Sequence, residues 1–429
     1  MNSLKKWLAL FALSFGYASM FVVPYAKYVF YDPMMEALNC TNLQLGAMVS
    51  LYVTIGIFTF VPGGWVADRF SAKKTISISL VAQGLLTIWF GLAMNLTVGW
   101  IVWVCFAFTN CFAYWAAALK GVRLLGDKED QGKLYGFFEA GYGLSSVIIS
   151  SIALAIFGRY VDQVAGFKMV VLVYSGFSIL AGIFTWLLYE DHMVETNEVT
   201  PKVGLKDVFF VLKQPVVWLI AIVIMTTYGL YVGQTYLTPY LTAVVGITVT
   251  FSGALAIIRT YGVKLLAGPV GGIIADKWKS PCRVLTIGYA LIIGLLFIFL
   301  NLPSTPSLGI VIVLMLSIAL VGAAMKGIMW STVEEAKVPR YYTGLAIGTA
   351  SIIGYLADIV LGPLFGYWLD NYGTVGYNYQ FAFLIGISVL GLVATLGILK
   401  TKNRAFSSVN TQFGGKETLD NSQKMQIKD

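Results

Sequence analysis

Twelve apolar stretches constrain the fold of this 429-residue chain more than any other feature. The hydrocarbon core of a bilayer takes about 20 helical residues to cross. The stretches cover residues 7–31, 43–66, 75–94, 98–119, 134–157, 168–189, 215–240, 251–275, 283–300, 308–328, 344–369 and 379–400. They are too long for barrel strands and lack alternating apolar and polar positions. We therefore expect an all-α membrane protein with twelve transmembrane helices.

The composition supports this interpretation and excludes several functions. Only 12% of the residues are charged, whereas a soluble protein carries about 25%. The four cysteines form no CxxC pair and there is one histidine, so we expect neither a metal nor another cofactor. The net charge of +8 is explained by basic loops that stay on the cytoplasmic side, so we expect no nucleic-acid partner.

The basic residues also orient the chain. If the N-terminus is cytoplasmic, the inner segments hold nearly all lysines and arginines, and the outer loops hold only Arg159 and Lys168. Both termini are then expected in the cytoplasm, with the protein in a bacterial inner (plasma) membrane. The longest internal polar connector divides the chain in two, and residues 204–212 within it suggest a short surface helix. The predicted regions are an N-terminal six-helix bundle (1–190), a cytoplasmic linker (191–214), a C-terminal six-helix bundle (215–400) and a disordered cytoplasmic tail (401–429).

A glycine-aspartate-basic loop occurs once in each half of the chain. The offset between the two aspartates is 276 − 68 = 208 residues, and Gly158-x-x-x-Asp162 matches Gly366-x-x-x-Asp370 at the same offset. This registered offset indicates an internal duplication of about 200 residues. The loop residues are Gly64, Asp68, Arg69, Lys73 and Lys74 in the first copy, and Gly272, Asp276, Lys277 and Arg283 in the second.

Six plus six spans, with this loop after spans two and eight, resemble the major facilitator superfamily. The resemblance implies two pseudo-symmetric six-helix bundles that rock about a central site, giving access to one side at a time. It also implies that the loops act as conformational latches. The first span, with Gly16-Tyr17-Ala18 and then Lys27, is similar to that of organophosphate:phosphate antiporters and related organic-anion transporters. Pro24 stands at about the position of their substrate-binding arginine, and Lys27 is the nearest cation.

Five charged residues fall deep within the predicted spans. A charge at the centre of a spanning helix costs at least about 2.5–3.5 kcal/mol, so these residues need partners or a wet cavity. Arg259 and Lys264 are about 140° apart around their helix. We expect Arg259 to face the substrate and Lys264 to pair with Asp358, although the reverse assignment remains open. The five residues are Lys27, Glu139, Arg259, Lys264 and Asp358.

The count of these charges favours an anionic substrate. If Asp358 pairs locally and Glu139 pairs with Lys120 and Arg123, positive charge is left over. The alternative is that every charge is paired and the substrate is neutral. Glu139 or Asp358 could instead carry a coupling proton if burial favours its protonated form. Further candidates for the substrate site are Tyr25, Tyr28, Tyr114, Tyr231 and Gln234.

The sequence therefore predicts a secondary active transporter and not an enzyme. We expect a monomer that moves a small organic anion, such as a carboxylate, sugar acid or phosphate ester, by alternating access. Proton-coupled symport and anion exchange both remain open, so a proton is an optional second partner besides the solute and the lipid bilayer. The alternative is an exporter of neutral or amphipathic compounds. A membrane enzyme or a non-transporting sensor is a more remote alternative.

Overall fold

The computed structural model describes residues 3–126, 130–191, 205–303 and 305–401, and all regular secondary structure in these residues is helical. Except for Thr401, the predicted tail lies outside them, as does the linker segment 192–204. The short helix expected within the linker is present as α9 (Leu205–Leu212).

The helices follow one another along the chain with short connections. The first half contains α1 (Ser3–Val22), η1 (Ala26–Tyr28), α2 (Tyr31–Leu38), α3 (Asn42–Arg69), α4 (Ala72–Ala93), α5 (Leu96–Ala107), η2 (Phe108–Tyr114), α6 (Trp115–Arg123), α7 (Gln131–Phe157) and α8 (Gln163–Leu188). The second half contains α10 (Pro215–Gly233), η4 (Gln234–Tyr236), α11 (Leu237–Ala243), α12 (Val249–Ile257), η5 (Ile258–Gly262), α13 (Val263–Trp278), α14 (Pro281–Leu300), α15 (Leu308–Ile328), η6 (Met329–Ser331), α16 (Thr332–Glu335), α17 (Arg340–Gly354), α18 (Leu356–Tyr372), η7 (Gly373–Val375) and α19 (Gly376–Thr401).

Ten helical stretches in the described residues are long and apolar enough to cross a membrane. The last of them, Tyr341–Thr401, has 61 residues and takes in α17, α18 and α19. Helix α1 is not one of the ten; it carries Lys5 and Lys6 in its first turns. The expected all-α membrane architecture is confirmed for the part of the chain described, while the count of twelve spans stays a prediction.

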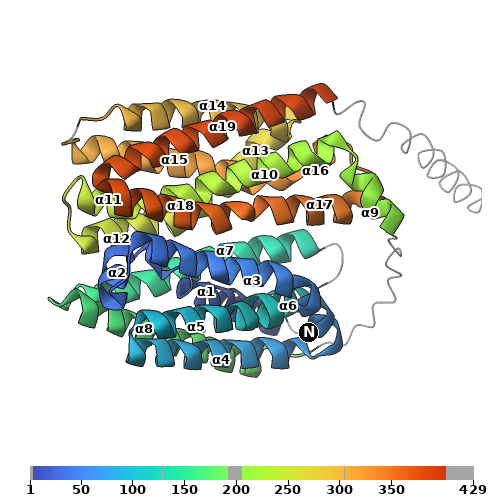
Figure 1. Ribbon diagram of the computed structural model, residues 1–429. Helices are drawn as coiled ribbons and strands as arrows, with labels where there is room; N and C mark the ends of the chain where they lie inside the picture. The colour runs from blue at the N-terminus through green and yellow to red at the C-terminus, as the bar shows by residue number, and fades with distance from the viewer. Residues whose placement is uncertain (1–2, 127–129, 192–204, 304, 402–429) are drawn as a thin grey trace, which may run out of the picture.

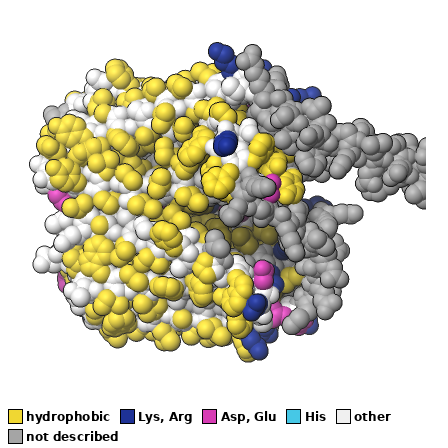
Figure 2. Space-filling model, turned by 45° about the vertical axis from the view of Figure 1, so that its right-hand side comes forward, with side chains coloured by type: hydrophobic (Ala, Val, Ile, Leu, Met, Phe, Trp, Pro, Cys, Tyr) yellow, Lys and Arg dark blue, Asp and Glu magenta, His cyan; other side chains and the backbone are white. Residues whose placement is uncertain are grey.

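Apolar side chains cover the outside of the molecule, as a lipid-facing surface requires. Figure 2 shows hydrophobic side chains over most of the visible face. Large residues such as Phe58, Leu187 and Ile273 expose 77%, 67% and 67% of their surface. A water-soluble monomer rarely exposes a continuous apolar area of this extent, so this surface is suited to lipid.

The chain folds into two halves that lie against each other (Figure 1). Helices α1 to α8 form one half and α10 to α19 form the other. The N-terminus and the end of α19 lie at the same end of the molecule, which we call the terminal face. Helices α2 and α11 lie at the opposite end, which we call the distal face.

The distal parts of α3 and α18 cross at very short range because glycines line the contact. A Cβ atom at Gly46 would overlap the carbonyl group of Gly362, and one at Gly366 would overlap the carbonyl group of Asn42. Small residues let two helix backbones approach closely where no hydrophobic effect drives them together. Any larger residue at these glycines would force the two halves apart.

Asp370 fastens this crossing. Its carboxylate accepts hydrogen bonds from the backbone N–H of Asn42 (2.9 Å), the backbone N–H of Leu43 (2.8 Å) and Nδ2 of Asn42 (2.7 Å). The first N–H groups of a helix have no partner within it and attract negative charge. Asp162, the duplicated counterpart, accepts among the described residues only from Val164 N–H, within its own half. Asp370 therefore links the two halves, whereas Asp162 does not.

Hydroxyl groups add two more links between the halves at the distal face. Thr238 Oγ1 donates to the carbonyl oxygen of Tyr28 at 2.9 Å, and Thr242 Oγ1 donates to Asp32 Oδ2 at 2.7 Å. Both threonines lie on α11, and their partners lie in or next to η1 and α2. Together with the α3–α18 crossing, these bonds seal the distal side of the molecule.

The duplicated loops, expected to act as latches, are fastened within their own halves. In the first copy, Ser71 Oγ and the backbone N–H of Lys73 both donate to Asp191. In the second, Ser280 Oγ and the backbone N–H of Cys282 donate to Glu335, at 2.6 and 2.7 Å. Each acid thus caps the helix that follows its loop.

The charged members of the two loops are less firmly held. Within the described residues, the side chains of Asp68 and Asp276 make no hydrogen bond or ion pair. The guanidinium of Arg69 stacks 4.2 Å from the ring centre of Trp65 on the same helix. The latch role of these loops therefore stays a prediction for another conformation.

Replacing Asp370 is expected to loosen the contact between the two halves at the distal face, which we call the distal seam. In a cysteine-free background, Asp370→Ala should increase maleimide labelling of Ser50→Cys from the distal side several-fold, because Ser50 is buried where its hydroxyl bonds to the backbone of Asp358. Asp162→Ala is the matched control and should leave the labelling unchanged. Equal labelling in both variants would show that Asp370 does not hold the seam.

Candidate functional site

A cavity of about 700 Å³ lies between the two halves. This volume is within the range of small-molecule binding sites, about 300–1,000 Å³. Its distal end is formed by Tyr28, Tyr52 and Thr260, and towards the terminal face it reaches Pro269 and Trp330. In Figure 2 the terminal face is turned partly towards the viewer, and a hollow is visible between the halves. Because the two halves are in contact at the distal seam, a solute would reach the cavity from the terminal side.

Two irregular helix segments border the cavity. Residues Phe108–Tyr114 and Ile258–Gly262 are π-helical, and each interrupts a longer membrane-crossing helix. π-Helical turns are uncommon and often mark functional positions, because they redirect the side chains that follow. The second segment carries Arg259, Thr260 and Tyr261, and Lys264 follows one turn later.

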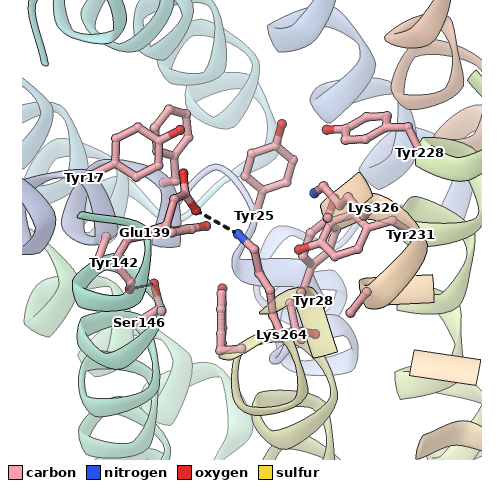
Figure 3. A pocket seen from close by; sticks show the side chains of 18 of the residues that line it. Tyr17, Tyr25, Tyr28, Glu139, Tyr142, Ser146, Tyr228, Tyr231, Lys264 and Lys326 are labelled. Atoms are coloured by element: carbon pink, nitrogen blue, oxygen red, sulfur yellow. Dashed lines mark hydrogen bonds and ion pairs between the residues drawn. The ribbon is translucent and has the colours of Figure 1, made fainter. Parts of the chain in front are cut away.

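Tyrosines dominate the polar lining of the cavity. Their hydroxyl groups offer hydrogen bonds, and their ring faces attract cations or stack on flat solutes. Figure 3 shows several of them gathered around the lysines, with contributions from both halves. The tyrosines that line the cavity are Tyr17, Tyr25, Tyr28, Tyr52, Tyr142, Tyr228, Tyr231, Tyr261 and Tyr355.

Lys264 and Glu139 form an ion pair across the cavity, from α13 to α7 (Figure 3). Their Nζ and Oε2 atoms are 3.4 Å apart, and Nζ also lies 4.6 Å from the ring centre of Tyr142. The predicted pair of Lys264 with Asp358 is therefore wrong for this conformation. The predicted placement of Glu139 beside Lys120 is wrong too, because Lys120 donates to the carbonyl oxygens of Ala67 and Asp68. The pattern of a helix predicts how deep a side chain lies and in which direction it points, but not which residue of the other half lies near it.

Asp358 and Lys326 lie on the other side of the cavity. Asp358 Oδ2 accepts a 2.8 Å hydrogen bond from the hydroxyl of Tyr228, and its Oδ1 has no partner among the described residues. Lys326 Nζ lies 3.3 Å from the ring centre of Tyr231 and 5.0 Å from that of Tyr228. Both charged groups line the cavity and come from the second half of the chain.

Lys326 is a cavity residue that was not predicted from the sequence. The predicted tenth span ends at residue 328, so this lysine fell at the boundary of the span. In the structure the helical stretch continues from Leu308 to Glu335, and Lys326 lies well inside it. The apolar residues after it, from Gly327 to Trp330, were the signal that would have placed it deeper.

Arg259 and Lys27 lie beyond the distal end of the cavity and are buried, with 2% and 3% of their surface exposed. Neither is among the residues that line the cavity. Of the two cations on this helix, Lys264 thus faces the cavity and Arg259 does not, contrary to the favoured assignment, and Arg259 donates to Thr238 and Thr260. Arg259 lies at the level where the two halves meet in the distal seam. The position of this seam could not be predicted from the sequence.

The remaining predicted site residues divide into two groups. Tyr25, Tyr28 and Tyr231 line the cavity, and their role in substrate binding stays a prediction. Tyr114 is fully buried, and its hydroxyl donates to the carbonyl oxygen of Leu13 at 3.4 Å. Gln234 faces a separate small space between α10, α15 and α19. Tyr114 and Gln234 are therefore part of helix packing, not of the cavity wall.

Positive charge exceeds negative charge in and directly behind the cavity. The charged groups there are Lys27, Arg259, Lys264 and Lys326 against Glu139 and Asp358, so the formal surplus is 4 − 2 = +2. In a low-dielectric environment such a surplus attracts an anion strongly. Among the groups that line the cavity, Lys264 and Lys326 balance Glu139 and Asp358, so the surplus comes from the two buried cations behind it.

Comparison with known proteins identifies the family. The profile of the Major Facilitator Superfamily matches residues 7–361. The chain belongs to this superfamily. Two relatives from Escherichia coli (strain K12) are inner membrane protein YqcE, 30% identical over 93% of this chain and 95% of its own, and inner membrane protein YihN, 31% identical over 92% and 96%. The D-galactonate transporter of E. coli O6:H1 (strain CFT073) is 21% identical over 85% and 88%. This facilitator is thus a multi-pass membrane protein of the inner-membrane type, and a transporter and not an enzyme.

Solved structures agree on the fold. A bacterial homologue of the human lysosomal transporter Spinster, in an inward-facing and unoccupied conformation, superposes with a TM-score of 0.74 at 16% identity, covering 93% of this chain and 99% of that one. The nucleoside transporter NupG superposes with a TM-score of 0.68 at 18% identity, covering 93% and 100%. At these identities the similarity concerns the fold alone.

The ion pair across the cavity is expected to couple its two members weakly. A double-mutant cycle of Glu139→Gln and Lys264→Gln should give an interaction free energy of about 0.2–1 kcal/mol in thermal unfolding, because both side chains are partly exposed to the cavity. The cycle of Glu139→Gln with Lys120→Gln is the control and should give none. Coupling in the control alone would restore the pairing predicted from the sequence.

Proposed function

We propose that this facilitator is a secondary active transporter of a small organic anion. The observation that carries the proposal is the surplus of two positive charges in and behind a cavity between the halves. Charged side chains buried in a membrane protein are costly in free energy unless they pair with opposite charges or take part in binding a solute. An anionic solute is the partner that would balance them.

We propose that the bilayer is crossed twelve times and that both termini are cytoplasmic. The placement of nearly all lysines and arginines in the loops of the terminal face supports this orientation. The two bundles would comprise residues 1–190 and 215–400. With the distal seam closed and the cavity reached from the terminal face, the structure corresponds to an inward-facing state. Transport would proceed by rocking of the bundles about the cavity.

The lining favours a carboxylate or sugar acid over a purely apolar solute. Lys264 and Lys326 offer ammonium groups to an acidic group. The nine tyrosines around them offer hydroxyl groups and flat ring faces to the hydroxylated carbon chain of a sugar acid. The name of the D-galactonate transporter, a distant relative, agrees with this substrate class.

A second candidate function follows from the apolar part of the wall. Phe21, Ile57, Phe60 and Trp115 also line the cavity, and they would suit an amphipathic compound. An exporter of such compounds would need the four cations in and behind the cavity to be balanced by protein groups alone. Of these four cations, only Lys264 forms an ion pair within the described residues, so we place this candidate second.

The class of solute can be tested with the purified protein. D-galactonate and D-gluconate should raise the thermal unfolding temperature more than D-galactose, because only the acids complete the charge balance. Lys264→Gln and Lys326→Gln should each weaken the effective affinity about tenfold or more, as expected for loss of a charge-assisted hydrogen bond. Arg159→Gln, an exposed control, should have no effect. Stabilisation by neutral or amphipathic compounds alone would reverse the proposal.

The coupling mode can be tested in proteoliposomes. We propose that a proton binds Asp358 during symport, since its Oδ1 has no partner in the described residues. An inward proton gradient should then drive accumulation of the anion in the wild type. Asp358→Asn should abolish this accumulation but retain exchange of one anion for another. Accumulation that persists in Asp358→Asn would assign the proton to another group, with Glu139→Gln as the next variant.

A further inference from the structure

Two buried cations lie between the cavity and the distal face, where they take no part in the cavity lining. Lys27 lies in η1 of the first half, and Arg259 lies in the π-helical segment η5 of the second half. Their neighbours in sequence, Tyr28 and Thr260, form the distal end of the cavity. Lys27 and Arg259 thus belong to the layer that separates the cavity from the distal side.

Arg259 is only partly satisfied by its surroundings. Its Nη2 atom donates to Thr238 Oγ1 at 3.1 Å and to Thr260 Oγ1 at 3.3 Å. Its Nε and Nη1 atoms are buried and find no hydrogen-bond partner in the part of the chain that the structure describes. A guanidinium has five N–H groups in a fixed fork that matches a carboxylate or a phosphate group. Two threonine hydroxyls therefore leave part of this fork unused.

Lys27 has no acidic partner either. Its ammonium lies 5.4 Å from the ring centre of Tyr236, which belongs to the other half, and it forms no ion pair within the described residues. The acid whose charge acts on Lys27 most is Asp358, but that carboxylate is hydrogen-bonded to Tyr228. The attraction to Tyr236 is weaker than an ion pair and does not cancel the charge.

The hydrogen bonds of Thr238 bring these two cations into one interface between the halves. Thr238 accepts from Arg259 and donates to the carbonyl oxygen of Tyr28, the residue that follows Lys27. When the halves separate at the distal face, this contact has to break. Both cations would then be exposed from the distal side, one on each wall of the opening.

We propose that Lys27 and Arg259 form a second anion-binding position, which receives the carboxylate or phosphate group of a solute when the distal side is open. This inference rests on the proposed function and divides the path of the solute into two levels, one at Lys27 and Arg259 and one at the cavity. An anion held between the two cations would offset their charge and so favour closure of the distal seam around it. The solute would then pass to Lys264 and Lys326, which line the cavity on the terminal side.

The proposal predicts that substitutions at the two levels act on opposite sides of the membrane. In vesicles of defined orientation, with D-galactonate and D-gluconate as probes, Lys27→Gln and Arg259→Gln should raise the half-saturating concentration from the distal side about tenfold, with a smaller change from the terminal side. Lys264→Gln should show the reverse asymmetry. The charge-keeping variants Lys27→Arg and Arg259→Lys should recover most of the distal affinity, and thermal unfolding should confirm that each variant folds.

The outcomes separate this inference from the proposed function. If the wild type transports neither probe nor any other organic anion, the proposed function fails and the second position fails with it. If the wild type transports an anion, but Lys27→Gln and Arg259→Gln leave both half-saturating concentrations unchanged, only the second position is overturned. Equal increases of the half-saturating concentration on the two sides would also overturn it, since the two levels would then act as one site.

A second measurement does not depend on the identity of the solute. In a cysteine-free chain, Val29→Cys places a buried thiol beside Lys27, where it is reached when the distal side opens. An anionic methanethiosulfonate reagent added from that side should react about tenfold faster than a cationic one. Arg259→Gln should reduce this preference, whereas Arg159→Gln should not. Equal rates for the two reagents in the parent chain would overturn the proposal.

Discussion

The cost of placing a charge in the low-dielectric interior of a membrane protein governs this structure. Each charged side chain deep in the bundle lies at the interface between the halves, and none of the six charges discussed above faces lipid with a large exposed area. Glu139 and Lys264 meet across the cavity, and Asp358 is held by Tyr228. The surplus of cations is therefore concentrated at the interface between the halves.

The two halves share a sequence repeat but not the same contacts. Asp162 and Asp370 are duplicated positions, yet only Asp370 crosses to the other half, where it caps α3. Asp191 and Glu335 play matching roles at the two loops of the terminal face. The duplication thus preserves the structure of each half, while the contacts between the halves differ at the two faces. This difference is what a carrier with one side closed at a time requires.

Much of the fold was predictable because it depends on local patterns. Apolar length predicted the membrane helices, and the polar connector predicted α9 at nearly its observed bounds. The depth of Lys264 and Asp358 followed from counting residues along a helix, and both line the cavity. The predicted tenth span, 308–328, has the observed bounds of α15, but the sequence did not predict that the helical stretch continues beyond α15, through Trp330 to Glu335. Lys326 lies two residues before the predicted end of the span and was therefore left out of the predicted site.

The sequence by itself determined that the chain is a helical membrane protein, that it is built from a repeat, and that cations outnumber acids in its interior. These properties follow from composition, periodicity and spacing, which need no knowledge of neighbours. Only the tertiary structure decided that Lys264 pairs with Glu139 and that Arg259 and Lys27 lie behind the cavity. These contacts join residues from different halves, and their distances depend on how the two bundles are rotated against each other in this conformation.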